Sequence, residues 1–230
     1  MENKIKIDKT QVFGFESALR GMRNPMNSWA SSDSDLLFDA YDHRINTKNM
    51  NDECFVLGEA DKTLAQKLTK AGSEHCKFLR QIHVWADFTF PRYWWSEMDT
   101  YSYNTKNSTS TMHKLMSRDL TLDDFIYDEL DEQSLNLVVN KLHDIRYLYC
   151  NATDTLQKHE LLRRAKQLLP EGYLQMRTMD TNYAELLNIY NQRFQHKLKP
   201  EWQDVMCSWI EQLPYFVELT GIGRKFTKGE

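Results

Sequence analysis

The sequence predicts an α+β fold in which several packed helices cover a small mixed sheet. Apolar residues recur at helical spacing over much of the second half of the chain and alternate as in a strand in two stretches of the first half. No apolar run approaches the roughly 20 residues that a membrane span needs. The 230 residues contain no repeat and no Pro/Gly/Ser-rich linker, so we expect a single domain over 1–230.

Composition narrows the class of protein. Hydrophobic residues make up 41% of the chain and charged residues 27%, which excludes a disordered protein. The net charge of −4 argues against a polymeric nucleic acid held by bulk electrostatics. The first residues alternate charged and apolar side chains and lack the apolar core of a signal peptide. We therefore expect a cytoplasmic protein that binds neither a membrane nor a polymeric nucleic acid.

The beginning of the chain predicts strand, helix and loop in that order. Alternating apolar positions from Ile5 to Phe13 indicate one or two edge strands with a break near Thr10. Residues 15–22 predict a short helix, and residues 23–35 predict a long polar loop. This loop is dense in Arg, Asn and Ser, and two interpretations stay open, a solvated loop and a loop that covers a substrate.

The middle of the chain predicts a helix, a strand and a second loop. Asp61 can cap a helix that ends at Gly72. Residues 82–90 alternate as in a strand, and the aromatic run after Pro91 favours the start of a helix. Residues 103–111 have no apolar face, so they predict a loop or a cap.

Four helices are predicted in the second half. The strongest pattern covers residues 129–149, and a second helix covers 155–169, just before Pro170. Residues 182–195 and 201–212 complete the set. These helices make the chain richer in helix than in strand.

Aromatic residues make up 12% of the chain and many of them lie between Phe78 and Tyr103. Such density is typical of a core, and a stacking platform for a planar ligand, built from residues such as Trp94 and Trp95, is the alternative. We favour the core.

The cysteines are far apart in the sequence and none forms a CxxC pair; they are Cys54, Cys76, Cys150 and Cys207. This spacing predicts reduced, mostly buried thiols rather than a disulfide framework or a zinc site. The histidines form no metal motif either, so we expect no bound metal.

The segment from Pro170 to Arg193 resembles the carboxy-terminal half of the flavin-dependent thymidylate synthases, the ThyX family. In that family a Leu-Pro leads through a strand to an Asn-x-Arg-x-Leu helix that ends in an arginine. The separations from Pro170 to Asn182 and from Asn182 to Arg193 fit this pattern without a gap. The stretch from Gly72 through His75 to Phe78 is similar to a Gly-His segment of the family.

The hallmark of the family is Arg-His-Arg followed, after seven residues, by Ser. Counted without a gap from Pro91, the hallmark falls on residues 100–102, with matches at Asn107 and Ser110. Its Arg-His-Arg is replaced by Thr-Tyr-Ser, and Ala184 stands where the later helix has Arg. The chain therefore resembles a divergent ThyX that lacks the signature.

The resemblance implies a homotetramer that passes a one-carbon unit from methylenetetrahydrofolate to C5 of dUMP, with FAD carrying hydride from NADPH. We favour a one-carbon transferase acting on a pyrimidine nucleotide. The alternative is a non-catalytic nucleotide-binding or interaction protein on the same fold. Neutral side chains replace the arginines, whose planar guanidinium groups make bidentate contacts to phosphates. We therefore expect weak or absent FAD binding.

The resemblance also implies the site residues. The substrate set is Asn107, Ser110, Arg177 and Arg193. The cofactor set is His75, Tyr101, Asn182 and Asn188. Ser110 and His113, three residues apart, are the catalytic candidates, because a nearby base can activate a serine hydroxyl.

Plain structural roles are the alternatives for the same residues. Ser110 and Asn182 can cap helices, and Arg193 can complement the dipole at the end of its helix. We expect Arg193 to anchor a phosphate. Without a buried partner, its truncation would cost little stability.

Overall fold

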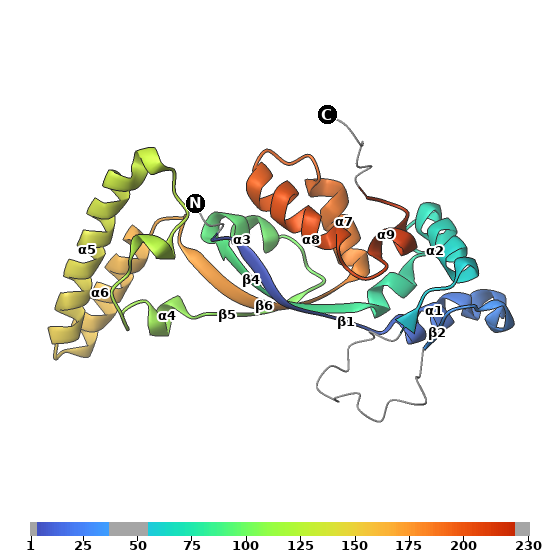
Figure 1. Ribbon diagram of the computed structural model, residues 1–230. Coiled ribbons are helices and arrows are strands. Elements are labelled where there is room, and N and C mark those ends of the chain that lie inside the picture. The colour runs from blue at the N-terminus through green and yellow to red at the C-terminus, as the bar shows by residue number, and fades with distance from the viewer. Residues whose placement is uncertain (1–3, 37–54, 224–230) are drawn as a thin grey trace, which may run out of the picture. The chain divides into compact units, whose positions relative to one another are not determined.

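The computed structural model describes residues 4–36 and 55–223 (Figure 1). The chain clusters into two compact units, and each is described by itself. The described residues of unit one are 4–6, 87–100 and 106–178. The described residues of unit two are 7–36, 55–86, 101–105 and 179–223.

The main sheet has four strands in the order β1-β4-β6-β5, and each strand contributes residues to both units. The strands are β1 Lys6–Phe13, β4 His83–Pro91, β6 Leu174–Asn182 and β5 Thr105–Ser108. β1 lies at an edge, as predicted, and is one strand with Lys9 at φ 55° rather than two strands broken at Thr10. Residues 103–111 were predicted to be a loop or a cap, but Thr105–Ser108 form β5, because they pair with β6 although they lack an apolar face. Ser110 in the same stretch is a helix cap.

A second, two-stranded sheet lies in unit two. It pairs β2 (Asp35–Leu36) with β3 (Phe55–Val56) in antiparallel register, Asp35 opposite Val56 and Leu36 opposite Phe55. With these sheets and the helices below, the α+β prediction is confirmed.

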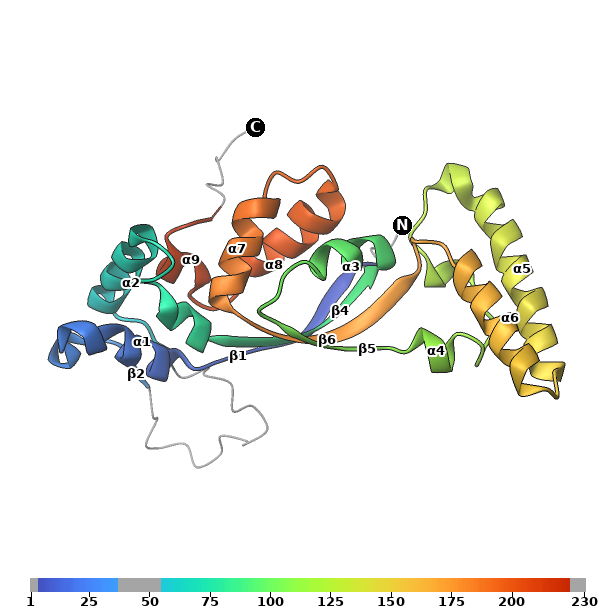
Figure 2. The same ribbon diagram turned by 180° about the vertical axis from the view of Figure 1, so that it is seen from behind.

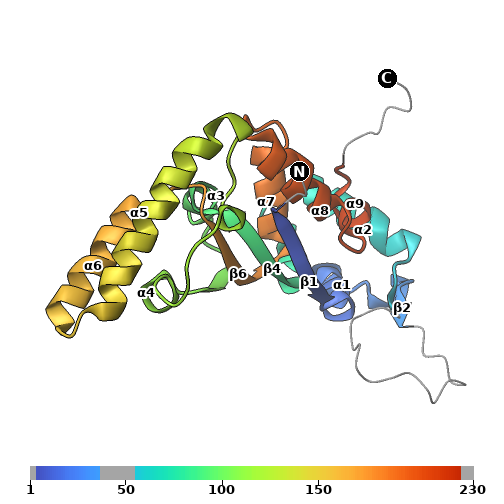
Figure 3. The ribbon, with the colours of Figure 1, turned by 60° about the vertical axis from the view of Figure 1, so that its left-hand side comes forward.

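Unit one contains a helical hairpin with its own apolar core. Its helices are α3 Arg92–Met98, α4 Thr111–Lys114, α5 Glu132–Asn151 and α6 Thr155–Leu168. α5 and α6 lie side by side in Figures 1 and 3. One face of α5 is buried in this core. It carries four apolar residues at helical spacing, Leu135, Val139, Leu142 and Ile145. The predicted helices 129–149 and 155–169 are thus confirmed within a few residues.

The aromatic run of unit one is a core. Phe90 and Trp94 stack with ring centroids 3.9 Å apart, and Trp95 meets Trp94 edge to face at 4.9 Å. Trp94 and Trp95 are 0% and 1% exposed. The alternative of a stacking platform is therefore wrong for these two indoles, since neither ring has a free face.

Unit two is mostly helical. Its helices are α1 Phe15–Arg23, α2 Glu59–Ala71, α7 Tyr183–Arg193, a π-helix Pro200–Cys207, α8 Ser208–Glu211 and α9 Phe216–Thr220. α2 packs on α9 (Figure 2) and α7 packs on the π-helix. The predicted helix 201–212 is therefore present, although most of it has π geometry.

The turn between β1 and α1 requires glycine. Gly14 has φ 99°, which disfavours residues with a Cβ. A Cβ at this position would also lie 2.5 Å from the carbonyl oxygen of Gln81. This close approach sets α1 against the short helical turn Lys77–Gln81.

The first turn of α2 is capped by a residue that lies far from it in the sequence. The Asp33 carboxylate accepts hydrogen bonds from the backbone amides of Ala60 (2.8 Å) and Asp61 (3.0 Å). Asp61 was predicted to be the cap, which is wrong, because it is inside the first turn and fully buried. Gly72 ends the helix, as predicted.

The cysteines of the described residues are free thiols. Cys76 and Cys207 are buried and Cys150 is exposed, whereas Cys54 lies outside the described residues. Within 4–36 and 55–223, no helix is both long and apolar enough to cross a bilayer.

Candidate functional site

The predicted site residues divide between the two units. Asn107, Ser110, His113 and Arg177 belong to unit one. His75, Tyr101, Asn182, Asn188 and Arg193 belong to unit two. In unit two, Tyr101, Asn182 and Arg193 lie together where the loop 101–105 packs against α7.

Tyr101 and Arg193 are in direct contact. The Nε of Arg193 donates to the phenol oxygen of Tyr101 at 2.8 Å, and that hydroxyl donates to Oε1 of Gln192 at 3.0 Å. The guanidinium also lies 4.5 Å from the ring centroid of the fully buried Trp202. The expectation that Arg193 has no buried partner is therefore wrong, and its plane is fixed by two rings.

Asn182 fastens the same loop to the first turn of α7. Its Oδ1 accepts the backbone amide of Glu185 at 3.0 Å, so the capping role is present. Its Nδ2 donates to the carbonyl of Tyr103 at 3.4 Å, and the buried Glu185 accepts the amide of Tyr103 at 3.2 Å. Tyr103 is thus held through both backbone groups while its ring stays 65% exposed.

A cavity of about 310 Å³ opens beside this loop, and we call it the Tyr103 pocket. It is lined by His83, residues 102–105 and residues 180–182. Two of its polar atoms are buried and have no hydrogen-bond partner among the described residues, the Oδ1 of Asn104 and the Oγ1 of Thr181. Because unpaired buried polar atoms are costly, such a pair is typical of a site that a polar ligand or water completes.

His83 and Asp180 form a pair at the edge of the Tyr103 pocket. They stand on the neighbouring strands β4 and β6, and Nδ1 of His83 lies 3.2 Å from Oδ1 of Asp180. The carboxylate orients the imidazole, an arrangement that suits transfer of a proton. No sequence motif singled out His83. The only signal was its outward position between the buried Ile82 and Val84.

The Tyr103 pocket does not fit the pyrophosphate of a flavin dinucleotide. None of its lining residues is Lys or Arg. The hydroxyl of Tyr101 is engaged by Arg193 and Gln192, and the guanidinium of Arg80 stacks on the Tyr103 ring at 5.6 Å. A pyrophosphate site typically uses Arg or Lys side chains, and the lining of the Tyr103 pocket contains neither.

In unit one, Ser110 is a helix cap. It precedes the four-residue helix α4, and its Oγ accepts the backbone amide of His113 at 3.2 Å. The hydrogen bond thus joins Ser110 to the main chain of His113. Asn107 and His113 are exposed. The catalytic and substrate roles of these three residues stay predictions.

Arg177 is held by a carboxylate. Its Nη1 donates to both oxygens of Asp99, at 3.0 and 3.1 Å, and its guanidinium lies 4.2 Å from the ring centroid of Trp95. In unit two, His75 is exposed, and the exposed Asn188 accepts a hydrogen bond from Gln192. Their binding roles also stay predictions.

No family model matches the chain, and no curated protein sequence matches it. Solved structures do match. A crystal structure of the flavin-dependent thymidylate synthase ThyX from Helicobacter pylori, complexed with FAD and dUMP, is 18% identical with a TM-score of 0.65, over 94% of this chain and 97% of that one. A second ThyX structure from Helicobacter pylori, also with FAD and dUMP, is 17% identical with a TM-score of 0.66, over 94% and 96%.

At this identity the likeness defines the fold. The chain is an α+β protein with a ThyX-like fold, and the match covers almost the whole length of both chains. The resemblance seen in the sequence from Pro170 to Arg193 is thus confirmed at the level of fold.

Proposed function

We propose that this protein binds a pyrimidine nucleotide of the dUMP type, with its base in the Tyr103 pocket and its phosphate at Arg193. The two buried, unpartnered polar atoms of the pocket are the observation that carries the proposal. The Oδ1 of Asn104 is an acceptor and the Oγ1 of Thr181 is a donor, and a uracil ring offers an N–H beside carbonyl oxygens. The exposed ring of Tyr103 adds a surface for stacking.

The phosphate assignment is supported by the way Arg193 is held. Tyr101 joins Arg193 to the loop that lines the Tyr103 pocket. A guanidinium whose plane is already fixed loses little conformational entropy when it binds a phosphate.

Calorimetric titration of dUMP tests the proposal. Arg193→Gln should weaken binding at least tenfold, since a charged contact to phosphate is lost. Arg146→Gln, which changes an arginine of unit one paired with Asp119, should leave affinity unchanged. Equal affinities for Arg193→Gln and wild type, or no dUMP binding by a folded wild type, would contradict the proposal.

One-carbon transfer to C5 is the second candidate. It is favoured by the His83–Asp180 pair, which can hold or accept a proton at the pocket edge. Release of tritium from C5-labelled dUMP, measured with methylenetetrahydrofolate, FAD and NADPH present, tests it. Release above a no-protein control that is lost in His83→Gln supports the enzyme, whereas no release with dUMP bound supports the non-catalytic alternative.

We also propose a homotetramer, the assembly implied by the resemblance to the ThyX family. Multi-angle light scattering at micromolar concentration tests it directly. A mass near 27.4 kDa, that of one chain, would contradict it.

A further inference from the structure

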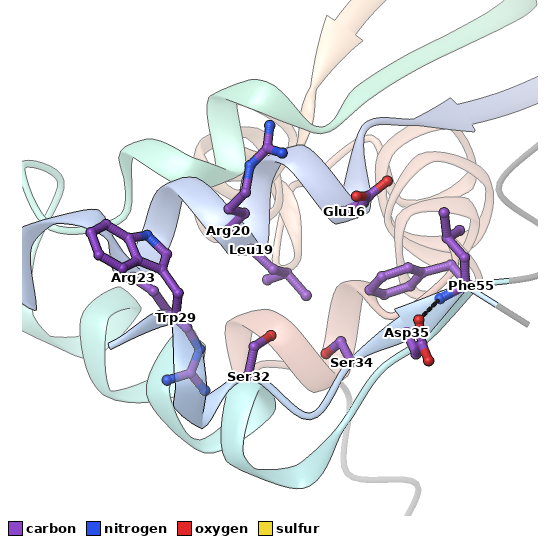
Figure 4. A pocket seen from close by; sticks show the side chains of 10 residues that line it. Glu16, Leu19, Arg20, Arg23, Trp29, Ser32, Ser34, Asp35 and Phe55 are labelled. Atoms are coloured by element: carbon purple, nitrogen blue, oxygen red, sulfur yellow. Dashed lines mark hydrogen bonds between the residues drawn. The ribbon is translucent and has the colours of Figure 1, made fainter. Parts of the chain in front are cut away.

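Unit two contains a second cavity, of about 390 Å³, which shares no lining residue with the Tyr103 pocket. It lies between α1 and the segment 29–36, with Phe55 at one end (Figure 4). Pockets for small molecules are typically roughly 300–1,000 Å³ and mostly apolar, with a few fixed polar groups. The segment belongs to the polar loop for which the sequence left a substrate-covering role open. We call this cavity the Trp29 pocket.

The apolar walls of the Trp29 pocket suit a flat ring. Leu19 and Phe55, both buried, point toward its centre, and Trp29 stands at the opposite end from Phe55 (Figure 4). The indole is 50% exposed, and its Nε1 donates to Oδ1 of Asn24 at 2.8 Å, which fixes the ring. A half-exposed, fixed indole is a surface on which a heteroaromatic ring can stack.

The polar groups of the Trp29 pocket are organised by one buried carboxylate. Asp61 is fully buried, and its Oδ1 accepts from Nε of Arg23 at 2.5 Å. Its Oδ2 accepts from the Ser32 hydroxyl at 2.8 Å and from the backbone amide of Ser34 at 3.1 Å. Burial raises the pKa of Asp61, but hydrogen bonds from Ser34, Ser32 and Arg23 together lower it below its ordinary value.

This network leaves one acceptor on Ser32 and one donor on Arg23, and both residues line the cavity. The only hydrogen of the Ser32 hydroxyl is directed to Asp61, so the oxygen can offer a ligand only its lone pairs. Arg23 is 4% exposed, and its Nη2 has no hydrogen-bond partner among the described residues. Asp61 neutralises the charge of Arg23, so nothing in this pair favours an anion over a neutral acceptor.

We infer that the Trp29 pocket binds an amino-substituted heteroaromatic base of the purine type. An exocyclic amine beside a ring nitrogen presents a donor for Ser32 next to an acceptor for Arg23, and the ring stacks on Trp29. A ring with a carbonyl in place of the amine presents the wrong group to Ser32. The inference does not rest on nucleotide binding in the Tyr103 pocket.

Adenosine and inosine are the matched probes, because they differ at the exocyclic amine. Calorimetric titration of the full chain should show saturable adenosine binding and at least tenfold weaker inosine binding. Trp29→Ala should weaken adenosine binding about tenfold and Trp29→Phe much less, since the phenyl ring keeps the stacking surface. Trp85→Ala, at a similarly exposed indole outside the cavity, should leave it unchanged.

Several results would overturn the inference. Absence of saturable adenosine binding by the folded chain is one, and equal affinity for the two nucleosides is another. An equal loss in Trp29→Ala and Trp85→Ala would also overturn it. If dUMP displaced adenosine in simple competition, adenosine would have to be assigned to the Tyr103 pocket, which would also overturn the inference. If dUMP did not bind at all, the expected adenosine results would be unchanged.

Discussion

Two polar groups in unit two are buried to nearly the same degree and differ in their hydrogen bonds. Asp61 is 0% exposed, and its carboxylate accepts from Arg23, from Ser32 and from the backbone amides of residues 33–34. Thr181 is 2% exposed, and its hydroxyl has no partner among the described residues. A buried group costs stability unless it is paired, so the two groups have opposite energetic roles.

Asp61 therefore stabilises the fold, whereas Thr181 is free to serve the candidate site. The bonds of Asp61 join α1, the segment 32–34 and the start of α2, so loss of the carboxylate should weaken unit two as a whole. The hydroxyl of Thr181 contributes no such bond. Its removal should therefore lower the affinity for a ligand more than it lowers the stability of the fold. Variants at each position test this distinction.

Asp61→Ala should have the largest effect. It leaves the buried guanidinium of Arg23 without its counter-charge, which typically costs about 3–5 kcal/mol. Urea denaturation measures the change in the free energy of unfolding. Asp180→Ala, which removes a half-exposed carboxylate from the same unit, is the control and should change it by less than about 1 kcal/mol. Similar losses in both variants would remove the distinction.

Acid should lower the stability of the folded chain by protonating the carboxylate of Asp61. Because the folded-state pKa of Asp61 lies below its ordinary value of 3.8, the ionised form stabilises the folded chain above that pH. This stability is lost as the pH falls from 3.8 through the lower folded-state pKa. The melting temperature of wild type should therefore fall more steeply below pH 4 than that of Asp61→Asn, and parallel curves would contradict the assignment.

Thr181→Val and Thr220→Val form the sharpest matched pair. Both threonines are 2% exposed, but the Thr220 hydroxyl donates to the carbonyl of Phe216 at 2.6 Å. Thr220→Val should cost about 1 kcal/mol of unfolding free energy, whereas Thr181→Val should cost nothing or stabilise. Calorimetry should show weaker dUMP binding only in Thr181→Val. Equal destabilisation by the two changes would mean that Thr181 has a structural partner.

Asn182→Ala should have a modest effect on stability. It removes the cap of α7, which is typically worth about 1 kcal/mol. Asn188→Ala, on the exposed face of the same helix, should stay within about 0.5 kcal/mol of wild type. Thermal unfolding of the two variants in parallel measures the difference, and an equal shift would show that the cap contributes little.

Local periodicity predicted most of the helices, because burial of one face fixes the spacing of apolar residues. The helix α5 was found from Leu135, Leu142 and Ile145 in this way. Strand β5 was missed, because it is held by backbone pairing with β6 and carries no apolar alternation. Long-range pairing of this kind leaves no local pattern in a sequence.

The same limit applies to the candidate site. Asn182 and Arg193 were proposed from the resemblance to the ThyX family, in which an Asn begins and an Arg ends the same helix. His83 and Asp180, 97 residues apart, meet only through neighbouring strands. Asp61 was predicted only as a helix cap, because its partner Arg23 lies 38 residues earlier and the pair is visible only in the fold.

The pairing of β2 with β3 has a practical consequence for the chain between them. Leu36 and Phe55 are direct partners in the antiparallel ladder, so their backbones are already as close as the two arms of a hairpin. A two-residue Asn-Gly turn can close such a pair, and a shorter connection lowers the entropy of the unfolded chain. Exchanging residues 37–54 for Asn-Gly should therefore keep the register Asp35 opposite Val56, which a crystal structure of the variant would check.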